Sequence, residues 1–234
     1  MLFRSFALGI DYVLVLPFTQ EFSQLSPEAF VSDILVKQLN VHTIIIGYDH
    51  HFGMNRSGNF ATLVELSKIY NFAVQEIPAT SIDEIAVSST RIRKALSNNA
   101  LHEANQLIGR PYQLAGTVIH GKQLGRTIGF PTANIHPNDP YKLIPSHGVY
   151  AGIASVENKR YKMVCNIGVR PTVDGDNLSI EAHLFDFNKN IYGEHITLFL
   201  VQYLRNEQKF ESLEALKSQI FLDAQQAQNL VSLD

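Results

Sequence analysis

A stretch near the middle of the chain carries the residue types that phosphate chemistry needs. It runs from His120 to Asn134 and combines glycines with cations: Gly121, Lys122, Gly125, Arg126 and Gly129. Glycines let a backbone turn where side chains would clash, and they let its N–H groups come close to a ligand. Successive N–H groups in such a loop form a concave anion site, and nearby cations add charge. The stretch therefore predicts a loop that binds phosphate.

The end of this stretch adds two oxygen donors. Thr132 and Asn134 are two residues apart, so on an extended backbone their side chains point the same way. A hydroxyl and an amide carbonyl are hard donors of the kind that Mg²⁺ accepts beside phosphate oxygens. The spacing alone leaves a second interpretation open, in which a glycine-rich turn joins two strands and these two polar side chains cap it.

A second motif places cations where a helix disfavours them. In the sequence Ser88-Ser-Thr-Arg-Ile-Arg93, Ser88 or Ser89 is a helix N-cap, so Arg91 and Arg93 fall in the first turn. That end of a helix dipole is positive. A bound anion would compensate, because the free N–H groups and the arginines would then act together. The alternative is a helix that tolerates a small misfit.

The first half of the chain is expected to alternate strands and helices. Residues 1 to 8 resemble the tail of a helix, a helix start is expected at Ser26-Pro27-Glu28, and a further helix is expected near residues 60–70. Three short apolar runs are expected as buried strands: Tyr12–Leu16, Thr43–Gly47 and Ala73–Ile77. This alternation predicts a parallel α/β sheet, in which ligands bind beyond the carboxyl ends of strands. Gly47–Gly58 follows such an end.

The pattern changes after about residue 109. Two helices, near 88–97 and 100–107, precede Gly109, which is expected as a helix C-cap and a boundary. Strand-like segments then follow one another without helices between them: Thr117–His120, Val149–Val156, Tyr161–Ile167, Ser179–Phe187 and Ile196–Leu204. Turn residues, such as those at 173–177 and 188–190, join them. Consecutive strands of this kind predict an antiparallel sheet closed as a small barrel.

The C-terminal residues are expected to form two helices. Leu213, Leu216 and Ile220 share one apolar stripe, and Asp223 is expected as the N-cap of a second helix that carries Ala227, Leu230 and Val231.

The long motif Gly121–Asn134 resembles the signature of riboflavin kinases. Further pieces resembling that family follow in order: Gly148–Ala151, Cys165–Thr172, Ile180–Leu184, and Arg205 with Lys209-Phe210. The similarity covers roughly residue 110 to the C-terminus. It implies a six-stranded antiparallel barrel that transfers the γ-phosphate of ATP to the 5′-hydroxyl of riboflavin, with Mg²⁺ as cofactor and FMN and ADP as products.

The resemblance also implies roles for individual residues. Glu181 falls at the position of the family's catalytic carboxylate, and in an alternating strand it points away from Ile180 and Ala182; the alternative is a solvent-facing strand glutamate. Thr132 and Asn134 would bind the metal, and Arg205 and Phe210 would lie near the flavin. Nucleotide binding is implied for Gly121, Lys122, Gly125, Arg126, Gly129, Phe130 and Pro131.

The N-terminal half resembles the adenylyltransferase half of bacterial bifunctional riboflavin kinase/FAD synthetases. The candidate nucleotide-binding residues there are Asp49, Arg56, Ser89, Thr90, Arg91 and Arg93. Such enzymes carry an early Gly-x-Phe-Asp-Gly-x-His-x-Gly-His stretch, which this sequence does not contain.

We therefore expect an incomplete Rossmann-like nucleotidyltransferase domain over residues 1–109, a riboflavin kinase domain over 110–234, and no FAD synthesis. A truncated form of the bifunctional enzyme would explain the missing stretch. Two other functions stay open: the full bifunctional activity, and a non-catalytic module that binds flavin or nucleotide.

Composition excludes several classes of protein. The 234 residues are 45% hydrophobic, which is enough for two modest domains, and carry a net charge of −3. The absence of a Lys/Arg-dense segment argues against nucleic acid as a partner. The single Cys165 rules out an intrachain disulfide and suits a reducing compartment. We found no apolar run of the ~18 residues that a membrane span needs, so we expect a cytoplasmic enzyme with small-molecule substrates and no membrane partner. Oligomeric state is left open.

Overall fold

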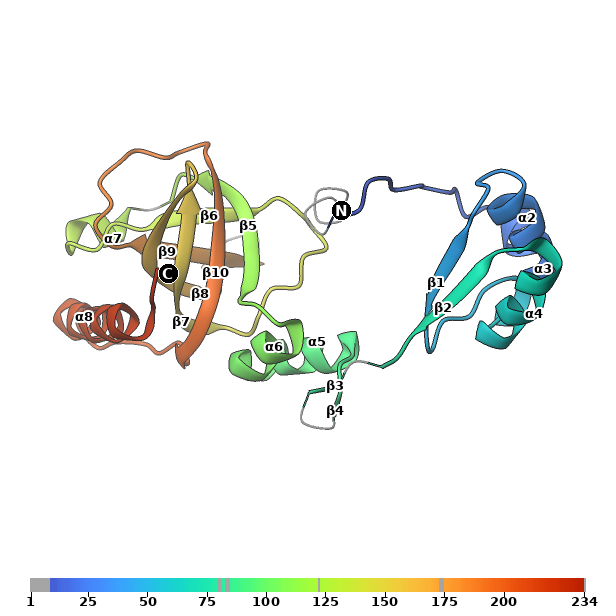
Figure 1. The fold of residues 1–234 in the computed structure, drawn as a ribbon. Coiled ribbons are helices and arrows are strands. Elements are labelled where there is room, and N and C mark those ends of the chain that lie inside the picture. The colour runs from blue at the N-terminus through green and yellow to red at the C-terminus, as the bar shows by residue number, and fades with distance from the viewer. Residues whose placement is uncertain (1–8, 80, 83–84, 122, 173–174, 234) are drawn as a thin grey trace. The chain divides into compact units, whose positions relative to one another are not determined.

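The computed structural model describes residues 9–79, 81–82, 85–121, 123–172 and 175–233 (Figure 1). The chain divides into two compact units, Met1–Thr80 and Ser81–Asp234, and each is described by itself. The expected helical tail at residues 1–8 lies outside the described residues.

The first unit is α/β, as predicted. Its parallel two-stranded sheet pairs Thr43↔Ala73 through Gly47↔Ile77, around a core of Val31, Ile46, Leu63, Leu66 and Phe72. In chain order, its elements are α2 (Gln20–Ser23), α3 (Pro27–Ala29), the π-helical η1 (Phe30–Val36), β1 (Thr43–Gly47), the 3₁₀ turn η2 (Met54–Arg56), α4 (Phe60–Tyr70) and β2 (Ala73–Ile77).

Local chemistry explains where these helices begin. Ser26 caps α3, because its hydroxyl accepts a hydrogen bond from the Ala29 amide at 3.1 Å, and Pro27 occupies the first turn. Asn59 and Thr62 form a reciprocal capping box at the start of α4. The helix start predicted at Ser26 is therefore confirmed.

The strand predicted at Tyr12–Leu16 is wrong. These residues have no regular secondary structure and are exposed, Tyr12 to 91%. A strand needs a neighbour to pair with its backbone N–H and C=O groups. Within the described part of the chain β1 pairs only with β2, so this run has no strand beside it. The apolar composition of Tyr12–Leu16 is not sufficient to form a strand without such a partner.

The second unit is a closed barrel with helices packed on it. Its elements are β3 (Ser81–Ile82), β4 (Ile85–Ala86), α5 (Ser89–Ser97), α6 (Leu101–Ile108), β5 (Tyr112–Ile119), α7 (Leu124–Thr127), β6 (Ala133–Pro137), β7 (Gly148–Val156), β8 (Lys159–Thr172), β9 (Gly175–Leu184), β10 (His195–Arg205) and α8 (Leu213–Leu230). The strand order around the barrel is β10-β5-β6-β9-β8-β7, and all the pairings are antiparallel. The predicted six-stranded barrel is confirmed.

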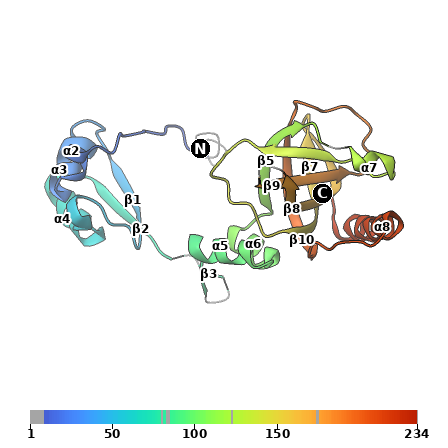
Figure 2. The ribbon, with the colours of Figure 1, turned by 180° about the vertical axis from the view of Figure 1, so that it is seen from behind.

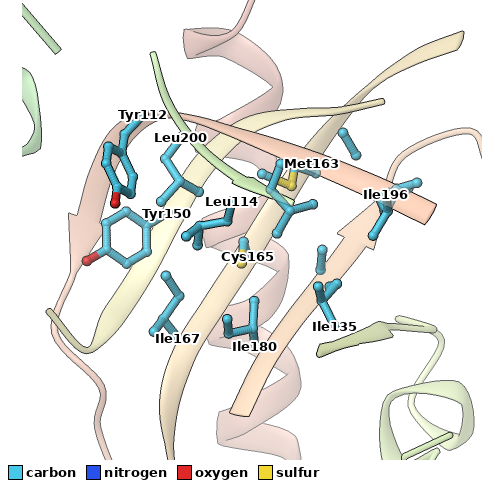
Figure 3. Packing of buried hydrophobic residues seen from close by; sticks show 14 of the residues in the cluster. Tyr112, Leu114, Ile135, Tyr150, Met163, Cys165, Ile167, Ile180, Ile196 and Leu200 are labelled. Atoms are coloured by element: carbon cyan, nitrogen blue, oxygen red, sulfur yellow. The ribbon is translucent and has the colours of Figure 1, made fainter. Parts of the chain in front are cut away.

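Alternation along the strands fills the barrel. On β5 every second residue from Tyr112 to Val118 is buried. Figure 3 shows such side chains from several strands meeting in one interior, among them Leu114, Cys165, Ile180 and Ile196. Cys165 is fully buried, and burial raises the pKa of its thiol, which keeps it in the unreactive protonated form.

Two helices precede β5 in this unit. Ser88 caps α5, because its side chain accepts from the Arg91 amide at 3.2 Å. Gly109 ends α6 with a left-handed φ of 75°, as its predicted C-cap role requires. Asn105 of α6 fixes the helix to the barrel by accepting from the Tyr112 amide at 2.8 Å and donating to the Leu200 carbonyl at 3.0 Å.

The two helices predicted at the C-terminus are one. α8 runs unbroken from Leu213 to Leu230 and packs against β7 and β8 (Figure 1, Figure 2). Its N-cap is Ser212, whose side chain accepts from the Ala215 amide at 3.1 Å. Asp223 is buried in the middle of the helix and binds Arg205 instead of capping a turn. The predicted cap is therefore wrong, because the carboxylate is held by a residue distant in sequence. None of the described helices is both long and apolar enough to cross a membrane.

Candidate functional site

Glu181 lies on the outer face of the barrel. Its neighbours on β9, Ile180 and Ala182, are buried inside, so alternation turns the Glu181 side chain outward. Across the sheet Glu181 is the register partner of Asn134 on β6 and of Asn166 on β8. Directly opposed residues on one face of a sheet are close neighbours. The carboxylate is thus flanked on both sides by asparagines.

Two hydroxyls bind the Glu181 carboxylate. Thr132 Oγ1 donates to Oε2 at 3.2 Å, and Ser179 Oγ donates to Oε1 at 3.1 Å. Hydrogen bonds of this kind fix the direction in which the carboxylate points. Thr132 and Glu181 are far apart in sequence, and the β6–β9 pairing brings them together.

Close packing explains two of the glycines in the 120–134 loop. A Cβ on Gly121 would overlap the side-chain amide of Asn134, and a Cβ on Gly125 would overlap the carbonyl oxygen of Phe130. The Gly125 carbonyl accepts from the Phe130 amide at 2.8 Å. Glycine therefore lets the loop fold back onto the residues that begin β6.

A cavity of about 320 Å³ lies beside Glu181. Ile128, Val149, Val164 and Ile220 contribute apolar lining. Six residues that the sequence assigned to different roles also line it: Gly125, Phe130, Thr132, Glu181, Arg205 and Phe210. An apolar pocket with a few convergent polar groups is the usual form of a small-molecule site.

A second cavity, of about 570 Å³, shares Thr132 with the first. Arg126 and Pro131 line it, together with Tyr192 and the loop residues 188–191. Tyr192 stacks on His120 with ring centroids 3.8 Å apart. Since Thr132 borders both cavities, two ligands, one bound in each cavity, would come close to each other at its hydroxyl.

An ion pair forms part of the wall of the first cavity. Arg205 Nη2 lies 2.7 Å from Asp223 Oδ2, and Arg205 Nε lies 2.9 Å from Oδ1. Gln219 also donates to the Asp223 carboxylate, at 2.9 Å. The Arg205 guanidinium carbon is 5.8 Å from the centroid of the Phe210 ring, within cation–π range. Arg205 therefore has a partner in the protein and also holds Phe210 beside the cavity.

Comparison with known proteins agrees with this arrangement. Residues 108–231 match the riboflavin kinase family, and residues 4–91 match the FAD synthetase family. The chain belongs to the riboflavin kinase family.

Several relatives are similar along most of the chain. The bifunctional riboflavin kinase/FMN adenylyltransferase of Buchnera aphidicola subsp. Schizaphis graminum is 44% identical over 219 residues, covering 92% of this chain and 69% of that protein. The protein of the same name from Escherichia coli K12 is 40% identical over 226 residues, covering 96% of this chain and 72% of that protein. A crystal structure described as a macrolide-efflux protein from Streptococcus pneumoniae superposes with a TM-score of 0.88 at 30% identity, over 97% of this chain and 73% of that one.

The donor set of this riboflavin kinase family member fits a metal held largely by its substrate. Among the described residues, no group of three or more His, Cys, Asp or Glu side chains could hold an ion. Thr132, Asn134 and Glu181 nevertheless share the outer face of neighbouring strands and offer only oxygen donors to a cation. Mg²⁺ is commonly bound by one or two protein oxygens together with water and substrate phosphates.

The residues at this site that were not identified from the sequence include Asn166, Ser179, His183 and Glu207. Ser179 and His183 are two residues before and after Glu181, so strand alternation could have placed them on its face. Asn166 and Glu207 could be placed at the site only from the three-dimensional structure. Asn166 is brought in by the β8–β9 register, and its side chain donates to Glu207 Oε1 at 3.0 Å.

The remaining residues predicted from the sequence, where the structure describes them, do not line the cavity beside Glu181. Lys122 lies outside the described residues, and Gly129 adopts a φ of +87° at the end of the loop. Asp49 and Arg56 are exposed in the first unit, beyond β1. Ser89, Thr90, Arg91 and Arg93 belong to the start of α5 in the second unit.

Arg91 has a partner within the protein. Its Nε lies 2.8 Å from Glu103 Oε1 of α6. Glu103 therefore balances the charge of one of the two arginines at the start of α5, and no bound anion is needed for that. Arg93 is exposed, and an anion-binding role for it stays a prediction.

Proposed function

We propose that this protein transfers the γ-phosphoryl group of ATP to the 5′-hydroxyl of riboflavin, releasing FMN and ADP. The observation that carries the proposal is the Glu181 carboxylate, bound by Thr132 at 3.2 Å and bordering an apolar cavity of about 320 Å³. Membership of the riboflavin kinase family supports the choice of substrates.

The first cavity fits the flavin. Its lining is mainly apolar, and Phe210 and Phe130 offer aromatic surface to a flat ring. The Arg205–Asp223 pair adds a polar edge that is already neutralised, so an uncharged ring system does not have to compensate a buried charge. A ligand with an apolar ring and a hydroxylated tail would thus place its tail toward Glu181.

Glu181 acts on the 5′-hydroxyl in this account. A carboxylate within hydrogen-bond reach orients the hydroxyl and takes its proton as the oxygen attacks the γ-phosphorus. The new bond joins the 5′-oxygen to that phosphorus, and the bond from phosphorus to the β–γ bridging oxygen breaks, so ADP leaves. Such transfers depend mainly on positioning and on charge stabilisation.

The nucleotide is assigned to the glycine loop and the second cavity. Arg126 and Pro131 line that cavity, and the loop N–H groups between Gly121 and Gly129 are candidates for contact with phosphate. Thr132 borders both cavities, which would put the terminal phosphate next to the hydroxyl that receives it.

Thr132 and Asn134 are the residues that we propose would hold Mg²⁺. When bound there with the phosphates, the ion would neutralise charge on the transferring group. The protein's own contribution is to hold the two oxygens beside Glu181, with Asn134 on β6 and Thr132 directly before it.

We also propose that this chain does not make FAD. The 234 residues contain no Gly-x-Phe-Asp-Gly-x-His-x-Gly-His stretch, although residues 4–91 match the FAD synthetase family. We assign residues 1–109 to an adenylyltransferase-like domain and residues 110–234 to the kinase. Asp49, Arg56, Arg91 and Arg93 are the candidate nucleotide-binding residues of the adenylyltransferase-like domain.

Product analysis tests these proposals together. The purified chain is incubated with riboflavin and Mg·ATP, and the flavins are separated by chromatography. FMN without FAD is the expected result. FMN followed by FAD would overturn the loss of adenylyltransferase activity. Unchanged riboflavin, from protein shown to be folded by circular dichroism, would overturn the kinase assignment.

A further inference from the structure

His183 contacts the loop that carries the proposed phosphate and metal ligands. Its Nδ1 lies 2.7 Å from the carbonyl oxygen of Pro131. A carbonyl oxygen only accepts hydrogen bonds, so the ring must carry its proton on Nδ1 and donate it. This contact fixes both the position of the ring and its tautomer.

The contact lies just beyond the end of the backbone pairing between β6 and β9. β6 pairs with β9 at Ala133↔Ala182 and Asn134↔Glu181, and Thr132 directly precedes the first residue of β6. The ladder stops there, and the residue before Thr132 is Pro131, which has no N–H to donate. The Pro131 carbonyl accepts a hydrogen bond from the His183 side chain.

Two outward side chains of β9 therefore hold two consecutive residues of the loop. Glu181 accepts from the Thr132 hydroxyl at 3.2 Å, and His183 donates to the Pro131 carbonyl at 2.7 Å. Aromatic packing restricts the imidazole further, because its centroid lies 5.4 Å from that of Phe130 and 5.4 Å from that of Phe185. The ring is half-buried and borders the same cavity as Glu181.

We propose that His183 is a positioning residue: its Nδ1–H holds the Pro131 carbonyl and thereby sets where the Thr132 hydroxyl meets the Mg²⁺-nucleotide. The inference rests on the proposed kinase function for what Thr132 binds. The role assigned to His183 is the hydrogen bond to Pro131, and no proton transfer passes through the ring.

Isosteric substitutions separate this role from packing. The amide nitrogen of Asn can occupy the place of Nδ1, whereas that of Gln can occupy the place of Nε2. Phe keeps an aromatic ring but offers no donor. We expect His183→Asn to keep most of the function, and His183→Phe and His183→Gln to lose it. Groups that orient the ligands of a metal typically contribute about 10–100-fold to metal affinity or activity.

The decisive measurements are the dissociation constant of Mg·ADP by calorimetry and the KM for Mg·ATP, each with the unfolding temperature of the same variant. His183→Phe should weaken Mg·ADP binding about 10-fold or more and should raise the KM for Mg·ATP, while the KM for riboflavin changes less. His136→Phe and His136→Asn, on the exposed outer part of β6, are the matched controls and should leave both constants unchanged.

The outcomes separate this inference from the proposed function. Unchanged Mg·ADP binding in His183→Phe would overturn the role proposed for His183. Equal losses in the Asn and Phe variants would overturn it too, since Asn retains the donor. A wild-type protein that binds Mg·ADP but makes no FMN would refute the kinase proposal instead, and the comparison of Mg·ADP affinities would still test His183.

Discussion

Arg205 and Asp223 join the end of β10 to the middle of α8, with Nη2 and Oδ2 2.7 Å apart. Both side chains are largely shielded from water, 22% and 5% exposed, and both border the cavity beside Glu181. The pair therefore sets the distance between the last strand and the helix that forms part of the cavity wall. It also keeps the Arg205 guanidinium beside the Phe210 ring.

Replacing Asp223 with Leu should destabilise the second unit strongly. The substitution leaves the Arg205 charge largely buried without its carboxylate, and breaking such pairs typically costs about 3–5 kcal/mol. Urea denaturation of the purified protein measures the loss. The control is Asp33→Leu, which breaks an exposed pair with Lys37, and exposed pairs contribute little to stability because water screens them. Equal losses in the two variants would contradict the structural role of Asp223.

Asn134→Ala should raise the Mg²⁺ concentration needed for half-maximal FMN formation. The substitution removes one proposed oxygen donor and leaves Thr132 in place. Asn138→Ala, the same change just after β6, where the side chain bonds Thr117 and His195 instead of facing Glu181, should leave the Mg²⁺ titration unchanged. If the wild type and Asn134→Ala show the same Mg²⁺ titration at unchanged thermal stability, Asn134 does not bind the metal. Its role would then be to cap the loop, where its amide packs against Gly121.

Tyr150 predicts a loss of stability in alkali. Burial raises the pKa of its phenol to about 12, whereas a tyrosine in an unfolded chain ionises near about 10. Between these values the native state binds more protons than the unfolded state, so the free energy of unfolding falls as pH rises. The slope of stability against pH between about 10 and 12 should be shallower in Tyr150→Phe. Identical slopes in the two proteins would show that Tyr150 does not contribute.

The barrel could be predicted because its strands carry their own signals. β5 and the first half of β10 alternate buried residues with less buried ones. The same alternation over Ile180–Leu184 gave the outward direction of Glu181. β6 was missed as a strand because its residues, Ala133–Pro137, begin inside the 120–134 loop motif and end in a proline.

The failures share one physical cause, which is dependence on partners distant in sequence. Tyr12–Leu16 has a strand-like composition but no strand to pair with among the described residues. Asp is a residue type that often caps helix N-termini, but Arg205 binds the Asp223 carboxylate. Asn166 joins the site only through the β8–β9 register. Composition and periodicity report local preference, and these three positions are decided by tertiary contacts.

The most direct test of the account is phosphoryl transfer to riboflavin by Glu181→Gln. Label transfer from γ-labelled ATP to the flavin is measured for the wild type and the variant, with riboflavin and Mg·ADP binding measured in parallel. The control is Glu194→Gln, the same change at an exposed residue outside both cavities. We expect Glu181→Gln to bind both ligands but to transfer label about 10²–10⁴-fold more slowly, while Glu194→Gln matches the wild type. Transfer at a near-normal rate by Glu181→Gln would contradict the assignment of Glu181 as the base.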